Sequence, residues 1–319
     1  MIRKSEICLR TVPSRFAVCT AIAFLFLSVG TTRAADCGNG VTLRLSAPET
    51  GQGSLLLATL RSAKRLSEVT GKWNELAVPF WEDPLLKGME KKQSVVAGDV
   101  WRALLGVDLE KPAGKYQFTV SAPIRTGETL SCTVSVEVKE GHFATESLTV
   151  KKQFAEPDPE QLARAQAESK RLREIYEHVT PEQLWKGKFR LPLDGDFKGS
   201  NFGRRRVLNG KPGSPHSGVD FPAPTGTPVH AAQSGRVVLA EELYYAGNAV
   251  IVDHGLGIYT LYCHFSEMDA KVGDIVSAGT VLGKVGATGR VTGPHLHWGL
   301  TVERAHVNAL DIVKLLGGK

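Results

Sequence analysis

The density of glycine and proline in the second half of this chain most constrains its fold. The 319 residues include 33 glycines and 16 prolines, and from residue 188 onward these residues separate short apolar segments. Glycine and proline interrupt helices and mark turns, so the pattern favours short strands over long helices. The clearest strands are expected at residues 236–239, 249–252, 259–262, 281–285 and 295–302. We therefore predict an all-β domain over residues 188–319.

Residues 36–150 predict a separate, β-sandwich-like accessory domain. Alternating apolar and polar segments recur there, with turn residues between them, at residues 41–45, 54–60, 115–120 and 133–138. Such spacing is typical of a small sandwich of two sheets. This half contains no evident cluster of reactive side chains. We interpret it as a spacer or as a domain that binds the cell wall.

A single long helix is expected between these two regions, within a helical linker at residues 151–187. Asp158 can cap the helix, Pro159 suits its first turn, and Gln161 can complete a capping box. Apolar residues fall on one face and charged residues cover the rest. This pattern predicts a helix that packs along one domain or bridges two, and a short coiled coil is the alternative.

The first 35 residues have the composition of a secretory signal peptide. A basic start is followed by an apolar run over residues 16–30 and by small residues around Ala34 and Ala35. This order predicts cleavage between Ala34 and Asp36. The apolar run is shorter than the roughly 20 residues of a spanning helix, and an uncleaved anchor is the alternative. We expect an exported protein, periplasmic, secreted or associated with the envelope, with no transmembrane segment in the mature chain.

Removal of the leader changes how the net charge is interpreted. The whole chain has a formal net charge of +6, and residues 1–35 contain five basic residues and one acidic residue. The mature chain therefore carries only +2, which gives no reason to predict binding to nucleic acid.

The remaining cysteines also fit export. Cys37 and Cys132 both lie in the N-terminal β region, and we predict a disulfide between them. Cys263 stands beside His264, which raises a Cys–His nucleophile as one interpretation. Successive residues on a strand point to opposite faces, so we favour a small buried cysteine behind the site.

Four side chains of the C-terminal half have the spacing of a metal site. His295 and His297 are two apart on a predicted strand, so both imidazoles should enter one cleft. His216 and Asp220 are four apart in a segment whose proline and glycine argue against a helix. Catalytic zinc sites use three such ligands and leave one position for water. One histidine of the 295/297 pair and His264 would then remain for proton transfer or for stabilising an oxyanion.

These motifs resemble those of the lysostaphin/LytM-type zinc endopeptidases, which hydrolyse peptides of bacterial peptidoglycan. The resemblance extends over about 110 residues, from Phe202 to Gly299, and includes the glycines at 235, 273, 279, 283 and 286. It implies a compact antiparallel β metallopeptidase domain that binds Zn²⁺ through His216, Asp220 and His297. It also implies that His264 and His295 are the catalytic histidines that do not bind the metal.

The resemblance leaves alternatives to an endopeptidase that hydrolyses peptidoglycan cross-links. Some relatives have lost ligands and only activate other wall hydrolases, so a non-catalytic regulator of an amidase, with a wall hydrolase or a divisome protein as partner, is the main rival. A pure wall-binding module is a second rival. Asn201 stands where an asparagine could occlude the zinc, and the run Arg204–Arg206 could attract carboxylates of wall peptides.

Overall fold

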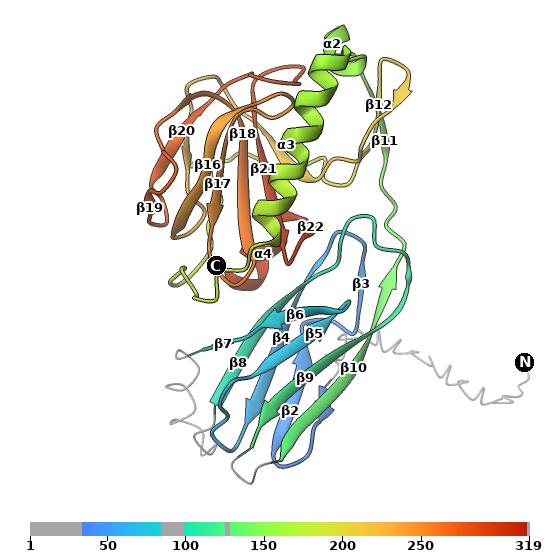
Figure 1. The fold of residues 1–319 in the computed structure, drawn as a ribbon, viewed down its shortest axis with the longest axis vertical. Coiled ribbons are helices and arrows are strands. Elements are labelled where there is room, and N and C mark those ends of the chain that lie inside the picture. Colours follow the sequence, from blue (N-terminus) through green and yellow to red (C-terminus); the bar gives the residue numbers. More distant parts are fainter. Residues whose placement is uncertain (1–33, 84–98, 125–127, 318–319) are drawn as a thin grey trace, which may run out of the picture. The chain divides into compact units, whose positions relative to one another are not determined.

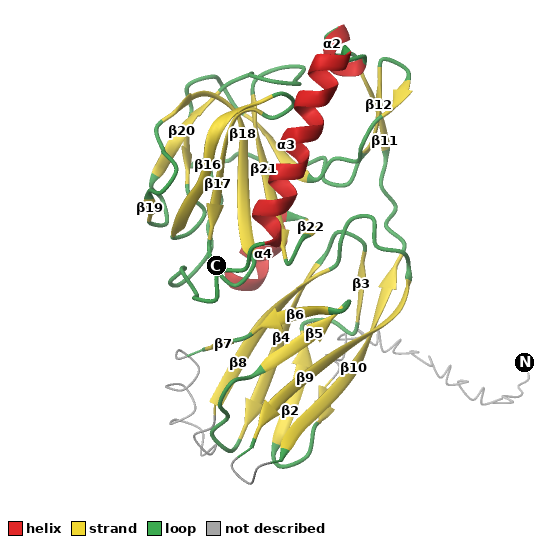
Figure 2. Ribbon diagram, in the orientation of Figure 1, coloured by secondary structure: helices red, strands yellow, loops and turns green. Residues whose placement is uncertain are grey.

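The computed structural model describes residues 34–83, 99–124 and 128–317, and within these ranges the chain is mostly β (Figure 2). The expected fold class, with an N-terminal sandwich-like region, a connecting helix and an antiparallel C-terminal domain, is confirmed. The predicted signal peptide lies almost entirely outside the described residues. In the described part of the chain, no helix has the length and apolarity needed to cross a membrane.

Two five-stranded sheets build the N-terminal region. The first has the order β1-β2-β4-β8-β7, with bounds Ala34–Asp36, Val41–Leu45, Leu55–Ser62, Asp99–Gly106 and Trp81–Glu82. The second has the order β3-β10-β9-β5-β6, with bounds Glu49–Gly51, Thr129–Lys139, Gly114–Pro123, Thr70–Trp73 and Leu76–Pro79. Strand β10 alternates buried and exposed residues along most of its length, because one face packs on the core.

The core of this sandwich is apolar and is tied by one covalent bond. Leu43, Leu60 and Phe118 are fully buried in it and come from both sheets. A disulfide joins Cys37 to Cys132, with 5.2 Å between the Cα atoms, as the sequence predicted.

Helices α2 (Lys152–Ala155) and α3 (Pro159–Glu177) follow the sandwich. The predicted capping box is present, because Asp158 accepts a hydrogen bond from the Gln161 amide and the Gln161 side chain accepts one from Asp158. Near its end, α3 packs Tyr176 against Tyr259 with ring centroids 5.6 Å apart. The long helix therefore packs along the C-terminal sheet (Figure 1).

The C-terminal domain is a sheet of nine strands. Its main path is β14-β21-β18-β17-β16-β19, with bounds Gly218–Pro222, His295–Val302, Ile258–Met268, Gly247–Asp253, Gly235–Leu243 and Ile275–Val276. Three shorter strands complete it, β15 (Pro228–His230), β20 (Val281–Val285) and β22 (Ala305–Val307), and helix α4 (Ala309–Leu316) follows. Neighbouring strands are antiparallel.

A small third sheet shows where the expected domain boundary differs from the strand pairing. Strand β11 (Thr145–Leu148) lies within the range predicted for the accessory domain. It pairs in parallel with β12 (Arg205–Leu208), which in turn pairs with β13 (Lys211–Pro212). Residues 145–148 therefore pair with a strand that comes shortly before the predicted metal ligands His216 and Asp220. The domain boundary at residue 150 stays a prediction.

Candidate metal centre

The pairing of β14 with β21 brings together three of the predicted site residues. Asp220 lies opposite His297, and Pro222 lies opposite His295. Because side chains alternate along a strand, Asp220, His295 and His297 project from one face of the sheet. Leu296 and Trp298 project from the other face and are fully buried there.

His216 reaches this group from the segment before β14. Its Nδ1 lies 2.8 Å from the backbone carbonyl oxygen of Asn201, which can only accept a hydrogen bond. Nδ1 therefore carries the proton, and the lone pair of Nε2 is left for a metal ion. The backbone amide of His216 also donates to the carbonyl of Arg204 at 2.9 Å. These two bonds fix both the backbone and the ring of His216.

The three potential ligand atoms lie close enough to share one ion. Nε2 of His216 is 2.8 Å from Nδ1 of His297, and each of these nitrogens is 3.0 Å from Oδ1 of Asp220. Tetrahedral zinc with bonds of about 2.05 Å separates its ligand atoms by roughly 3.3 Å. A shift of a few tenths of an ångström would admit the ion, so two imidazoles and one carboxylate form a donor set that fits Zn²⁺.

His264 and His295 lie beside this group without joining it. The ring of His295 is held by Nδ1, 2.8 Å from the Gly293 carbonyl, and its Nε2 lies 3.7 Å from Oδ1 of Asp220. Nδ1 of His264 lies 2.9 Å from the carbonyl of Thr288. The centroids of the two rings are 4.8 Å apart, and both residues line the same hollow.

A β-bulge places His264 at the site. Between Asn248 and Val250 the pairing of β17 with β18 shifts register, and His264 has φ +68°, a value that few residues other than glycine adopt. The simple alternation expected for Cys263 and His264 is therefore wrong, since both residues line the same hollow. Cys263 is nevertheless buried, and burial raises the pKa of its thiol, which argues against a nucleophile.

Burial sets the charges of the site. Desolvation lowers the pKa of His297 to about 4 and holds the pKa of His264 well below its usual value, so both imidazoles are neutral near pH 7. Burial alone would raise the pKa of Asp220, but hydrogen bonds with His216 and His297 outweigh it and keep that pKa below its ordinary range. One anion and neutral imidazoles are the protonation states that a metal requires.

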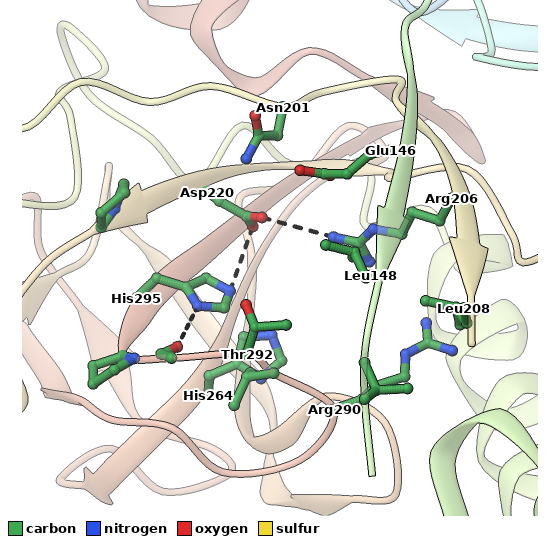
Figure 3. A pocket seen from close by; sticks show the side chains of 15 residues that line it. Glu146, Leu148, Asn201, Arg206, Leu208, Asp220, His264, Arg290, Thr292 and His295 are labelled. Carbon is green, nitrogen blue, oxygen red and sulfur yellow. Dashed lines mark hydrogen bonds and ion pairs between the residues drawn. The ribbon is translucent and has the colours of Figure 1, made fainter. Parts of the chain in front are cut away.

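The site opens into two adjoining hollows. The larger, of about 270 Å³, is lined by Asp220 and His295 together with Glu146 and Leu148 of β11 (Figure 3). The smaller, of about 200 Å³, is lined by His216 and His297 among others. Three residues line both hollows, namely Arg206, His264 and Arg290.

The contacts of two neighbours of the site, Gly218 and Arg290, were not predicted from the sequence. Gly218 has no room for a side chain, because an added Cβ would lie 2.5 Å from Nε2 of His297. Arg290 lies within the glycine-rich segment before His295. Its positive charge so close to a predicted site residue could have indicated that it also belongs to the site. The side chain of Asn201 points into the larger hollow near Asp220 (Figure 3), whereas its backbone carbonyl holds His216.

Comparisons with known proteins identify the family that the C-terminal part of the chain resembles. Residues 214–309 match the model of peptidase family M23. Peptidoglycan DD-endopeptidase ShyA of Vibrio cholerae serotype O1 is 45% identical over 123 residues, which cover 38% of this chain and 29% of ShyA. DD-carboxypeptidase/endopeptidase Mpg of Neisseria meningitidis serogroup B is 41% identical over 97 residues, which cover 30% of this chain and 22% of Mpg. The chain thus spans less than a third of the length of these relatives.

The resemblance to a solved structure is more extensive. A Pseudomonas aeruginosa protein of known crystal structure, assigned to peptidase M23, is 27% identical to this chain. The two structures match with a TM-score of 0.60 over 82% of this chain and 94% of that one, so the likeness extends beyond residues 214–309. The family resemblance inferred from the two histidine motifs is confirmed. The C-terminal part of this chain is a peptidase family M23 domain.

Proposed function

We propose that this protein is a zinc-dependent endopeptidase that hydrolyses peptide cross-links of bacterial peptidoglycan. The observation that carries the proposal is the convergence of three ligand atoms from His216, Asp220 and His297 within 4.8 Å of one another, beside an open hollow. ShyA and Mpg, whose names describe endopeptidases, support the choice of substrate. A peptidoglycan substrate in turn favours a protein that works outside the cytoplasm.

Each site residue has a proposed role. His216, Asp220 and His297 hold the metal, and a bound Zn²⁺ supplies a Lewis acid that polarises the substrate carbonyl and acidifies water. His264 is neutral and directs Nε2 into the hollow, so it can accept a proton or a hydrogen bond there. His295 is oriented by the Gly293 carbonyl and directs its own Nε2 into the same space.

The two histidines divide the remaining work. One takes the proton of the attacking water, and the other stabilises the oxyanion or protonates the leaving amine. Their rings are 4.8 Å apart, and the His264 ring is 6.0 Å from that of His297, so both can reach one scissile amide. Among the described residues of the two N-terminal sheets, none lines these hollows, which fits a spacer or wall-binding role.

Digestion of purified peptidoglycan tests the proposal. The mature protein with Zn²⁺ should convert cross-linked muropeptides to uncross-linked ones, as measured by chromatography and mass spectrometry. Asp220→Ala should lose both bound zinc and product. His295→Ala should keep most of its zinc and release no product, because His295 is not a ligand in this proposal.

The same experiment distinguishes the rival functions. If zinc-loaded protein leaves the muropeptide profile unchanged, the endopeptidase proposal is rejected. A regulator would then be recognised by faster wall hydrolysis when an amidase is added, and this stimulation should survive His295→Ala.

A further inference from the structure

Three consecutive arginines precede the metal site, and the structure separates them by their partners. Arg204 forms an ion pair with Glu146 at 3.1 Å, and Arg205 forms one with Glu110 at 3.6 Å. Both of these side chains are at least 40% exposed. Arg206 instead turns inward and retains only 18% exposure. The basic run thus consists of two exposed arginines in ion pairs and one arginine that is largely buried.

Arg206 is poorly neutralised for a buried guanidinium. Its nearest acid is Asp220, at 3.7 Å through Oδ2, and Nε of Arg206 is buried without a hydrogen-bond partner. Burial lowers the pKa of Arg206, and the nearby carboxylates of Asp220 and Glu146 act in the opposite direction. When Asp220 also holds a metal ion, less of its negative charge is available to Arg206.

Arg290 places a second cation at the same hollows. Its guanidinium lies 4.4 Å from the ring centroid of Tyr245, and among the described residues it forms no ion pair. Burial lowers the pKa of Arg290, and repulsion from Arg206 lowers it further. Two half-buried guanidinium groups therefore line hollows that hold two carboxylates, Asp220 of the metal site and Glu146, which is paired with Arg204.

We infer that Arg206 and Arg290 form a receptor for a free carboxylate of the substrate, next to the peptide bond that is cut. This inference rests on the proposed function. Guanidinium groups present forked N–H donors that match a carboxylate, and buried charges require a partner. Both arginines line the two hollows together with His264, so the anion would lie beside the catalytic histidine (Figure 3).

The substrate class follows from this arrangement. It is a peptide in which a residue flanking the scissile amide carries an unblocked carboxyl group, whereas a peptide with a carboxamide there is a poor substrate. Glu146 also lines the larger hollow and interacts electrostatically with Arg206, but its hydrogen bond goes to Arg204, so it leaves the guanidinium of Arg290 free for the substrate.

The inference is tested with two synthetic D-alanyl peptide cross-links. One carries a free carboxylate beside the scissile bond, and the other is identical except that a carboxamide replaces this carboxylate. Wild-type protein should prefer the carboxylate substrate by about 10- to 100-fold in kcat/KM, the effect of one hydrogen-bonded charge. Arg290→Gln should remove most of this preference, because kcat/KM should fall much more for the carboxylate substrate than for the carboxamide. Arg290→Lys, which keeps the charge without the fork, should retain part of it. Arg205→Gln, which changes an exposed arginine, should retain all of it.

Arg290 is the better probe because Arg206 also contacts the metal ligand Asp220. A wild-type protein that cleaves both substrates equally would overturn the inference. So would Arg290→Gln if it lowered both rates by the same factor, since that is the signature of a structural role.

Binding of non-cleavable analogues to zinc-loaded protein, measured by calorimetry, separates this inference from the proposed function. Tighter binding of the carboxylate analogue that is lost in Arg290→Gln supports the receptor even if neither substrate is cleaved, and in that case only the endopeptidase proposal fails. Equal binding of both analogues rejects the receptor. Thermal unfolding of each variant checks that the fold is intact.

Discussion

The N-terminal sandwich and the M23 domain differ most in what they bury. Among the described residues, three polar or charged side chains are buried in the sandwich, namely Ser62, Asp83 and Asp99. Nine are buried from residue 188 onward, namely His216, Asp220, Gln233, Asp253, His254, Thr260, His264, Thr301 and Glu303. Buried polar groups cost free energy unless they are hydrogen-bonded, so the second region depends more than the first on internal hydrogen bonds.

Non-glycine residues at positive φ occur in both regions, but in the M23 domain one of them is a residue of the candidate site. The M23 domain places His264 at positive φ and buries Glu303 without hydrogen-bond partners for its carboxylate. The sandwich core is instead built from apolar residues of two alternating sheets. Such a division is expected when one region only has to fold and the other also has to hold a reactive group.

The largest effect is expected from a substitution that removes a proposed metal ligand. Asp220→Ala removes the one anion of the ligand group, so zinc affinity and peptidase activity should each fall at least about 10³-fold. Metal content by atomic absorption and muropeptide release measure the two losses. Asp99→Ala removes a buried acid of the sandwich and should leave zinc content unchanged. Retained zinc in Asp220→Ala would contradict the proposed ligand set.

The same leucine-to-alanine change in the two cores should destabilise both regions but affect zinc binding in only one of them. Leu60 and Leu296 are both fully buried, one in the sandwich and one between the two histidines of β21. Each change to alanine should lower the free energy of unfolding by about 2–5 kcal/mol. Only Leu296→Ala should also weaken zinc binding, by about 10-fold, because the strand that orients His297 loses its packing. Denaturant unfolding and zinc titration of both variants test this, and equal zinc affinities would show that packing does not position the ligand.

Local features of this chain were predictable from its sequence. The capping box of α3 depends on Asp158 and Gln161, which are three residues apart, and it is present. The alternation that places His295 and His297 on one face is equally local. The disulfide was predicted because Cys37 and Cys132 both lie in the N-terminal β region, whereas Cys263 lies in the C-terminal domain.

Features that depend on distant pairing were not predictable. The parallel pairing of β11 with β12 joins Thr145 to Arg205 across 60 residues, and no local pattern indicates it. The bulge that turns His264 into the site arises from the register between β17 and β18. Arg290 and Arg206 are 84 residues apart in the sequence, and only the fold brings them close enough to repel each other. The presence of a second arginine at the hollow was therefore not predicted.

A smaller effect is expected from the close approach of β14 to His297. Gly218→Ala would place a Cβ 2.5 Å from Nε2 of His297 and 2.9 Å from the Trp298 carbonyl oxygen. The ring must move, and a displaced ligand should lower kcat by about 10²-fold. Gly51→Ala in the sandwich is the matched control, because its Cβ would meet only Ser54 Oγ at 3.8 Å. Full activity in Gly218→Ala would mean that the ring tolerates a different position.

The smallest predicted effect concerns the pH dependence of stability. Glu303 lies in the turn between β21 and β22, and burial raises its pKa from 4.5 to about 9. The folded state therefore retains a proton that the unfolded state releases, so this group makes folding less favourable as pH rises from about 4.5 to about 9. Glu303→Gln should match wild type in unfolding free energy at pH 4 and exceed it by about 1–2 kcal/mol at pH 8. Asp99 of the sandwich accepts a hydrogen bond from the Leu66 amide at 2.9 Å, so Asp99→Asn should show no such gain. Parallel curves for wild type and Glu303→Gln across this range would show that Glu303 is not the strained group that distinguishes the two regions.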